Sequence, residues 1–361
     1  MTYSDAYLVG YYGMKNSGDD ALLAATAWGA KEFLDSKTLT ASTPIPLMIK
    51  NHSFFEPNLK HTQRFKGQNR LINYMGALKA KRVIFGGGSV LHTAQDINIK
   101  RHMMKLAGSN KNIAVGVGIG PFIDTKAERA CARFLNECHK VSVRDQESLE
   151  VGRAIAPNAN IQLSFDLAPL LLKQTDYEVR TIERSGIAVC LCPKERLHGD
   201  FVTEQQRLEC IADALIKAYK QTGQTIHLIS FNGHDQLGDD QINDELEKLL
   251  LGKASYQRIS YDPNPYRVLQ RLAGYKAIIS MRLHGSILGF LADTPVLSLN
   301  YHTKCTGWCQ QIGMPDQLAF DTASLNTNDL ANSLIEGLDF GFKMPEMTID
   351  QAVNASLKNW H

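Results

Sequence analysis

Short apolar segments alternate with amphipathic helical patterns along most of the chain, and this alternation constrains the fold more than any other feature. The pattern predicts parallel sheets with crossover helices, because parallel strands need a helix-length connection between them. At 361 residues the chain exceeds the roughly 250–300 residues that one hydrophobic core usually serves. The expected fold class is therefore α/β, with two doubly wound domains that face each other across a cleft.

The expected boundaries follow from where the strand pattern stops and restarts. A polar passage over residues 173–185 is the predicted linker between a first domain at 1–172 and a second at 186–320. Beyond about residue 321 only helical patterns remain, so residues 321–361 are expected to be helices that can pack back on the first domain. The expected strands are 7–12, 46–49, 82–85, 112–117, 140–143 and 161–163, then 186–191, 225–231, 277–280 and 295–299.

Composition excludes several classes of protein. A formal net charge of +2 argues against a general nucleic-acid binder, so an anion site must be a local group of cations. The cysteines are odd in number and include no C-x-x-C pair, and no metal-binding cluster is evident. No segment resembles a secretion signal or a membrane span. These features indicate a reduced, cytoplasmic protein of enzyme size, with no expected metal or cofactor.

A strand-to-helix turn near residue 282 predicts an anion site. Arg282 and His284 follow an apolar run and precede a helical one. In open α/β sheets ligands bind at such turns, outside the carboxyl ends of the strands. A guanidinium supplies forked donors for carboxylate or phosphate, an imidazole supplies a proton near neutral pH, and the helix N-terminus favours negative charge. A capping pair on a surface loop is the structural alternative.

Three further junctions add candidates. Gly86, Gly87 and Gly88 follow an apolar strand, and packing alone explains them poorly, so close approach of a ligand or of the facing domain is predicted. His92, in the same loop, is a candidate donor. Arg144 ends another strand and can join Arg282 in holding an anion, or else form a surface pair with a neighbouring acid. The glycine loop after the first strand leads into an acidic pair, Asp19 and Asp20.

Taken together, these motifs resemble the polysaccharide pyruvyl transferase family. Their order and their strand–helix context both match, and the resemblance spans most of the chain. His92 and Thr93 stand where family members vary, and His302 lies inside the Tyr301–Lys304 element; these departures leave the acceptor sugar open. The matching motifs are Gly10-Tyr-Tyr-Gly, Asn16-x-Gly18-Asp19-Asp20, Gly86-Gly-Gly-Ser, Ser142-Val-Arg-Asp, Met281-Arg-Leu-His-Gly and Tyr301-x-x-Lys304.

The resemblance implies two facing Rossmann-like domains in a GT-B-like arrangement. It also implies transfer of a pyruvyl group from phosphoenolpyruvate to a sugar, with formation of a cyclic ketal. In this reading His284 is the general acid and Asp19 accepts or orients the sugar hydroxyl. The donor side is expected in the second domain. The donor-binding candidates are Arg282, Arg144, Lys304, Leu283 and Gly285.

The first domain is the expected acceptor side. Its candidates are Asn16, Gly18, Gly86, Gly87, Gly88 and His92. The expected partners are phosphoenolpyruvate and a glycan or sugar-linked acceptor, with no nucleic acid, and with peripheral membrane contact if the acceptor is lipid-linked. The alternatives are a sugar-nucleotide glycosyltransferase and a non-catalytic carbohydrate-binding protein of the same fold. Neither the acceptor sugar nor the oligomeric state follows from the sequence.

Overall fold

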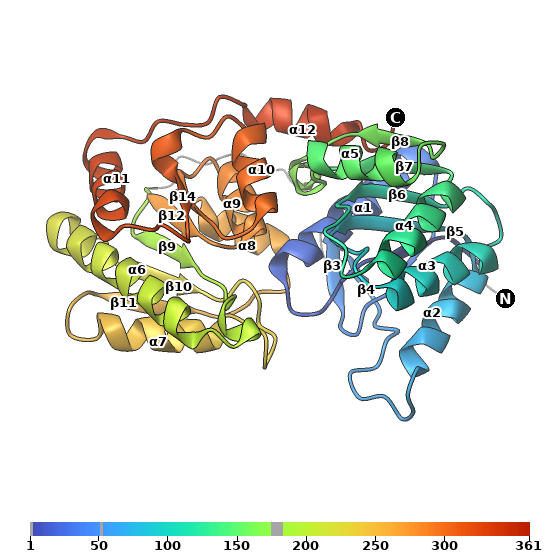
Figure 1. Ribbon diagram of the computed structural model, residues 1–361, viewed down its shortest axis with the longest axis horizontal. Coiled ribbons are helices and arrows are strands. Elements are labelled where there is room, and N and C mark those ends of the chain that lie inside the picture. Colours follow the sequence, from blue (N-terminus) through green and yellow to red (C-terminus); the bar gives the residue numbers. More distant parts are fainter. Residues whose placement is uncertain (1–2, 51–52, 175–182) are drawn as a thin grey trace. The chain divides into compact units, whose positions relative to one another are not determined.

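The computed structural model describes residues 3–50, 53–174 and 183–361 (Figure 1). It divides into two compact units. The first unit comprises residues 1–14, 19–175 and 350–361, and the second comprises residues 15–18 and 176–349. The predicted linker at 173–185 lies largely outside the described residues.

The first unit is built on a parallel sheet in the order β2-β1-β5-β6-β7-β8. The chain runs from β1 outward to β2, and then returns to the other side of β1 to form β5. The strand order therefore reverses between β1 and β5, which is where doubly wound sheets bind their ligands. The strands are β1 (Ser4–Val9), β2 (Leu39–Ala41), β5 (Ala80–Gly88), β6 (Ile113–Val117), β7 (Lys140–Val143) and β8 (Ile161–Leu163).

Helices cover both faces of this sheet. One face packs against α2 to α5 around a core that includes Phe85 and Phe134, and the other packs against α1 around Leu22 and Ile84. Thr93, Asp124 and Asp145 cap the N-termini of α3, α4 and α5. The helices are α1 (Ser17–Leu34), α2 (Gln68–Leu78), α3 (Ala94–Leu106), α4 (Thr125–Glu137), α5 (Gln146–Ile155) and α12 (Ile349–Leu357), with a short 3₁₀ helix η1 (Ala168–Lys173).

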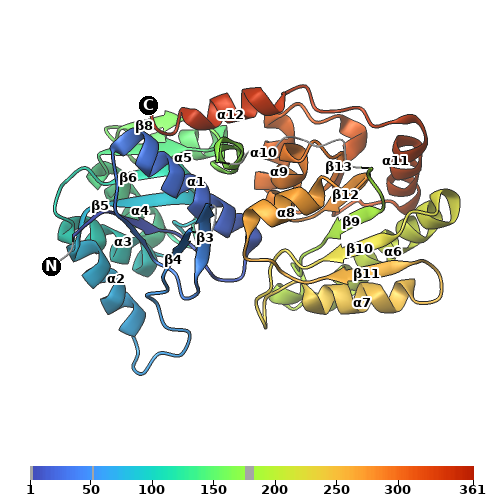
Figure 2. The ribbon, with the colours of Figure 1, turned by 180° about the vertical axis from the view of Figure 1, so that it is seen from behind.

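The second unit is also doubly wound, in the order β11-β10-β9-β12-β13-β14, and its strand order reverses between β9 and β12. Helices α6, α7 and α11 lie on one face of the sheet and α8, α9 and α10 on the other, as Figures 1 and 2 show from opposite sides. The strands are β9 (Ile187–Cys190), β10 (Ile226–Ile229), β11 (Tyr256–Ile259), β12 (Ala277–Ser280), β13 (Val296–Asn300) and β14 (Ala319–Asp321).

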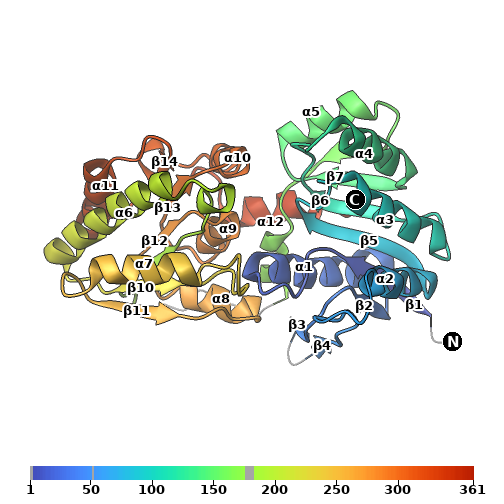
Figure 3. The same cartoon turned by 60° about the horizontal axis from the view of Figure 1, so that its bottom comes forward.

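Figure 3 shows α6 and α7 side by side. The helices of this unit are α6 (Phe201–Thr222), α7 (Asp240–Leu250), α8 (Pro265–Leu272), α9 (Leu283–Leu291), α10 (Thr303–Gln311) and α11 (Thr327–Phe340), with 3₁₀ helices η2 (Arg196–His198) and η3 (Asp316–Leu318). No helix in the described part of the chain is both long enough and apolar enough to cross a membrane. The prediction of an α/β protein with two Rossmann-like halves is confirmed.

One strand that was expected in the parallel sheet of the first unit lies outside it. The sequence predicts a strand over 46–49 in the parallel sheet, but β3 (Leu47–Lys50) pairs antiparallel with β4 (Ser53–Phe55) in a separate hairpin. The place beside β1 is taken by β2. A local apolar run indicates extended backbone but does not specify the pairing partner, and a short strand such as β2 carries almost no pattern of its own. The edge strands β11 and β14 were also not predicted, because neither has a fully buried residue.

The two C-terminal helices belong to different units. Helix α11 packs on α6, where Lys217 Nζ donates to Asn328 Oδ1 at 2.7 Å. Helix α12 and the residues after it belong to the first unit, where Asn359 Nδ2 donates to the carbonyl of Phe165 at 2.9 Å. Of the segment 321–361 that was expected to form one group of helices, only residues 350–361 join the first unit.

Candidate functional site

Arg282 lies where the strand order of the second unit reverses. Strand β12 ends at Ser280, and the backbone N–H of Met281 donates to the carbonyl of Cys190 at the end of β9, at 2.9 Å. Arg282 then takes the N-cap position of α9 with extended backbone. Its side chain therefore starts at the carboxyl edge of the sheet, at the N-terminus of a helix.

A buried carboxylate holds the Arg282 guanidinium. Asp239, which is 0% exposed, accepts from both Nε, at 3.1 Å, and Nη2 of Arg282 through its Oδ1 atom. Nη1 of Arg282 donates to no protein atom in the described part of the chain, and the side chain keeps 19% of its surface exposed. Burial by itself lowers the pKa of Arg282, but the charge and hydrogen bonding of Asp239, together with Cys192 and Tyr301, outweigh it and raise that pKa. The cation is thus permanent, oriented and still able to donate to a ligand.

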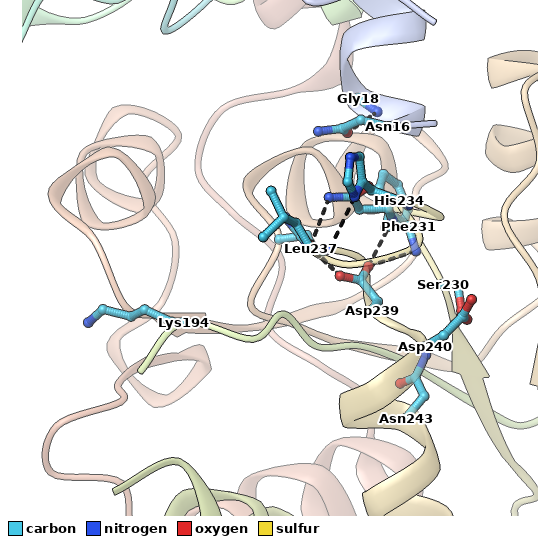
Figure 4. Close-up of polar contacts among 12 residues, drawn as sticks. Asn16, Gly18, Lys194, Ser230, Phe231, His234, Leu237, Asp239, Asp240 and Asn243 are labelled. Atoms are coloured by element: carbon cyan, nitrogen blue, oxygen red, sulfur yellow. Dashed lines mark hydrogen bonds and ion pairs between the residues drawn. The ribbon is translucent and has the colours of Figure 1, made fainter. Parts of the chain in front are cut away.

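The other oxygen of Asp239 organises the loop after β10. Oδ2 accepts the backbone N–H groups of Phe231, at 2.9 Å, and Asn232, at 2.8 Å (Figure 4). That loop in turn binds residues 15–18 of the N-terminal motif. Ser17 N–H donates to the Phe231 carbonyl at 3.0 Å, and Asn16 forms an isolated bridge with Asn232. The motif and the Arg282 turn are therefore joined through one carboxylate.

His284 lies in the first turn of α9, half-buried, and its ring packs against Gly18. A Cβ atom at position 18 would overlap the imidazole at Nδ1, so only glycine allows this approach. Asn16 Oδ1 accepts the N–H of Gly18 at 3.1 Å and fixes the backbone there. The sequence named Asn16 and Gly18 as candidates for the acceptor side, and the structure places both in the second unit, with Gly18 against His284.

Two lysines flank Tyr301 in the same unit. Lys304, in the first turn of α10, has its Nζ 5.6 Å from the centre of the Tyr301 ring, and Lys194 Nζ lies 5.7 Å from it. Both distances are within the range of cation–π attraction. Burial raises the pKa of the nearby Cys192 thiol, and the charges of Arg282 and Lys304 oppose that rise. The charges of Arg282 and Lys304 therefore both reach the buried thiol of Cys192.

The sequence did not point to Asp239 or Lys194. Asp239 lies 43 residues before Arg282, in a polar stretch ahead of α7 where an acidic residue is typical of helix initiation. Lys194 follows strand β9, and its place after the strand next to β12 is the signal that could have found it. Leu283 is buried, and Gly285 lies against Ser280 and Cys190, where a Cβ would overlap Ser280 Oγ. Donor contacts by these two residues stay a prediction.

In the first unit the glycine loop is tightly packed. A Cβ at Gly86 would overlap Thr26 and come within 2.5 Å of the Tyr12 hydroxyl, and one at Gly87 would come within 2.8 Å of Leu22. Packing against α1 thus accounts for both glycines, and the expectation that packing explains them poorly is wrong. Gly88 has a φ of 77°, a left-handed conformation that favours glycine. A ligand contact at any of the three stays a prediction.

Arg144 is buried in the first unit and not on its surface. It is 6% exposed, and its guanidinium contacts Asp145 at 3.4 Å, Asp166 at 3.7 Å and the hydroxyl of Ser89 at 3.1 Å. The alternative of a pair with a neighbouring acid is therefore confirmed for Asp145, but the pair is buried and not on the surface, and Asp166 adds a second carboxylate. Its predicted contact with the donor anion stays a prediction. His92 is exposed in the loop before α3.

The two acidic residues at the start of α1, Asp19 and Asp20, have different surroundings. Asp20 is buried, and its Oδ1 accepts the N–H of Gly13 at 3.0 Å, which holds the loop after β1. Asp19 is half-buried in the first turn of α1. The pKa of Tyr11 is raised mainly by the burial of Tyr11 itself, and the negative charge of Asp19 is the second cause. In the described residues no three His, Cys, Asp or Glu side chains form a group that could hold a metal ion.

Comparison with known protein families identifies the family of this chain. The family model for polysaccharide pyruvyl transferases matches residues 16–303. The chain belongs to that family. The match includes every candidate pyruvyl transferase residue named from the sequence except Lys304, which follows its last residue directly. A curated relative, the amylovoran biosynthesis protein AmsJ of Erwinia amylovora, is 22% identical over 287 residues, which is 74% of this chain and 67% of that protein.

Solved structures agree on the fold of this pyruvyl transferase family member. A putative UDP-N-acetylglucosamine 2-epimerase from Listeria monocytogenes matches with a TM-score of 0.61 at 10% identity, over 98% of this chain and 91% of that one. The UDP-GlcNAc 2-epimerase from Neisseria meningitidis, bound to UDP-GlcNAc, matches with a TM-score of 0.59 at 12% identity, over 98% and 96%. These likenesses show a GT-B-like fold.

Proposed function

We propose that this pyruvyl transferase family member transfers a pyruvyl group from phosphoenolpyruvate to a sugar of a cell-surface or extracellular polysaccharide, or to its precursor. The product is a cyclic pyruvate ketal, and phosphate is released. The observation that carries the proposal is the turn after β12, where an oriented Arg282 and the imidazole of His284 share one helix N-terminus. The name of the relative AmsJ supports a role in polysaccharide biosynthesis.

The donor carries a carboxylate and a phosphate, so its site needs at least two cationic anchors. Arg282 supplies the first, because Asp239 fixes its plane while Nη1 remains available. Lys304 supplies a second cation beside Tyr301, and the N-terminus of α9 adds backbone N–H groups. Arg144, from the first unit, is proposed as a further anchor that contacts the anion while it stays paired with its carboxylates.

The reaction needs a proton at one carbon and a nucleophile at the next. His284 delivers its proton to the methylene carbon of phosphoenolpyruvate, and the neighbouring carbon develops oxocarbenium character. A sugar hydroxyl adds to that carbon and gives its proton to a carboxylate, for which Asp19 is the candidate. Phosphate then leaves, a second hydroxyl adds to the same carbon and closes the ring, and the proton of that hydroxyl goes to the departing phosphate. The acceptor side is proposed to include Asn16, Gly18, the 86–88 loop and His92.

Protection by the donor gives a first test. A ligand that binds only the native state raises stability by mass action, about 2.7 kcal/mol at a hundred times its dissociation constant. Phosphoenolpyruvate should therefore raise the melting temperature, whereas inorganic phosphate should raise it less. A nucleoside diphosphate sugar serves as the competing ligand, because a glycosyltransferase of the same fold would prefer it.

The decisive experiment incubates the protein with phosphoenolpyruvate and a panel of glycan acceptors. Phosphate release should depend on the acceptor, and the product should show the methyl and quaternary carbon signals of a ketal by NMR. Release of nucleoside diphosphate from a sugar nucleotide, with no turnover of phosphoenolpyruvate, would instead establish the glycosyltransferase alternative.

A further inference from the structure

One stretch of the first unit contains several basic residues and no acidic ones. No Asp or Glu lies between Glu56 and Asp96, although the whole chain has a formal net charge of only +2. The stretch includes α2 and the loop that leads into it from β4, and Figures 1 and 2 show this loop extending away from the sheet. Its cations are Lys60, Arg64, Lys66, Arg70, Lys79, Lys81 and Arg82.

Helix α2 also exposes an apolar stripe. Leu71, Met75 and Leu78 are 50%, 47% and 56% exposed. Their i, i+4, i+7 spacing places them on one face of the helix. The opposite face holds α2 on the unit, because Asn73 accepts the hydroxyl of Tyr7 at 2.7 Å and Ala77 is fully buried. The stripe therefore faces away from the hydrophobic core of the unit.

Cations border the stripe. Arg70 and Lys79 lie about 100° to either side of it on the helix, and both are exposed. The loop before α2 adds exposed Lys60, Arg64 and Lys66 around Phe65, which is 55% exposed. None of these five cations forms an ion pair within the described residues, whereas Lys81 pairs with Asp5 at 2.7 Å. We call α2 and residues 60–66 the basic α2 surface.

We propose that the basic α2 surface docks this protein on an anionic lipid bilayer. An amphipathic helix lies in the membrane interface when its apolar face enters the acyl boundary and flanking cations bind anionic headgroups. Lys and Arg can also extend their charged ends toward the headgroups while their stems cover apolar surface. A soluble polyanion would use the cations alone and leave Leu71, Met75 and Leu78 in water, so a bilayer fits both features.

The test is sedimentation with phosphatidylcholine vesicles prepared with and without phosphatidylglycerol, at low and at physiological salt. We expect binding that requires phosphatidylglycerol and weakens with salt. One variant removes the stripe, by Leu71→Ser, Met75→Ser and Leu78→Ser. A second removes charge, by Lys60→Gln, Arg64→Gln, Lys66→Gln and Arg70→Gln. The matched control removes four exposed cations elsewhere, by Lys126→Gln, Lys248→Gln, Lys253→Gln and Lys343→Gln.

Each cation near an anionic surface contributes about 1 kcal/mol, or about fivefold in binding. The charge variant should therefore bind at least about a hundredfold more weakly, and the control should bind much like the parent. The stripe variant should lose most binding at both salt concentrations. Circular dichroism and thermal melting verify that the variants fold, which is expected because all the altered side chains are exposed.

Three results would overturn the proposal. The first is parent protein that does not prefer phosphatidylglycerol vesicles. The second is a control that weakens binding as much as the charge variant, which would make the attraction one of net charge alone. The third is a stripe variant that binds vesicles like the parent while heparin competes fully, which would identify a soluble polyanion as the partner.

Discussion

Both units are doubly wound parallel sheets, but the residues at the carboxyl ends of their strands are used differently. In the first unit, Gly86 and Gly87 are needed by the packing of α1, and Arg144 is enclosed by two carboxylates. In the second unit, Arg282 has one carboxylate partner, and its Nη1 donates to no protein atom in the described residues. A motif at the right place in a doubly wound sheet is therefore only a candidate. Side chains that already serve packing or ion pairs within their own unit have fewer groups left to contact a ligand.

The largest expected effect tests the second unit's imidazole. His284→Gln retains a hydrogen-bonding side chain but cannot deliver a proton, so turnover should fall by about 10²–10⁴-fold. Donor affinity should largely persist, because Arg282 and Lys304 are unchanged. Single-turnover kinetics and equilibrium binding of phosphoenolpyruvate measure the two quantities separately. Loss of binding with normal chemistry on saturated protein would make His284 an anion ligand instead.

Asp239 is the next test, because it joins Arg282 to the loop that holds residues 15–18. An amide cannot accept from both Arg282 and the two backbone N–H groups, so Asp239→Asn should lower the free energy of unfolding by about 3 kcal/mol and raise the KM for the donor. Urea denaturation and steady-state kinetics measure these effects.

Asp240→Asn is the matched control. Its carboxylate accepts from Ser230 at 2.5 Å and pairs with Arg258 at 3.3 Å, but its side chain is 63% exposed. The loss should therefore stay below about 1 kcal/mol. Equal effects of the two substitutions would show that burial of Asp239 does not matter to the site.

Arg282→Lys asks whether the planar fork matters or only the charge. A lysine cannot contact Asp239 through two nitrogens and still present a further donor, so phosphoenolpyruvate should bind about 10–100-fold more weakly, as for the loss of a hydrogen bond to a charged group. Isothermal titration measures the affinity. Unchanged binding and turnover would show that charge alone is sufficient at this position.

The smallest expected effect compares one glycine from each unit. Gly86→Ala overpacks the first unit against Thr26 and Tyr12 and should cost about 1–3 kcal/mol of stability with turnover retained in the folded fraction. Gly18→Ala forces the His284 ring to move and should lower turnover more than stability. Thermal melts and kcat on the same preparations separate the two outcomes. If both alanines affect only stability, the contact between Gly18 and His284 is a packing contact.

Much of the second unit could be predicted from local sequence. Strand β12 was predicted at its observed bounds, Ala277–Ser280, and a helix was predicted after it, although α9 begins at Leu283, ahead of the apolar run over 287–292. The reason is that both elements are buried and regular, so their periodicity is strong. The place of residues 15–18 could not be predicted. Ser17 bonds to Phe231, far along the chain, and no local pattern encodes such a partner.

The sequence by itself determined the α/β class with two Rossmann-like halves, the family and the position of the Arg-Leu-His turn, because periodicity and short motifs are local properties. Only the tertiary structure decided that Asp239 orients Arg282, that Gly18 packs on His284, and that α11 and α12 belong to different units. It also showed that Arg144 is enclosed while Arg282 keeps a free donor. These outcomes depend on which distant side chains meet, and long-range contacts of that kind leave no trace in the spacing of neighbouring residues.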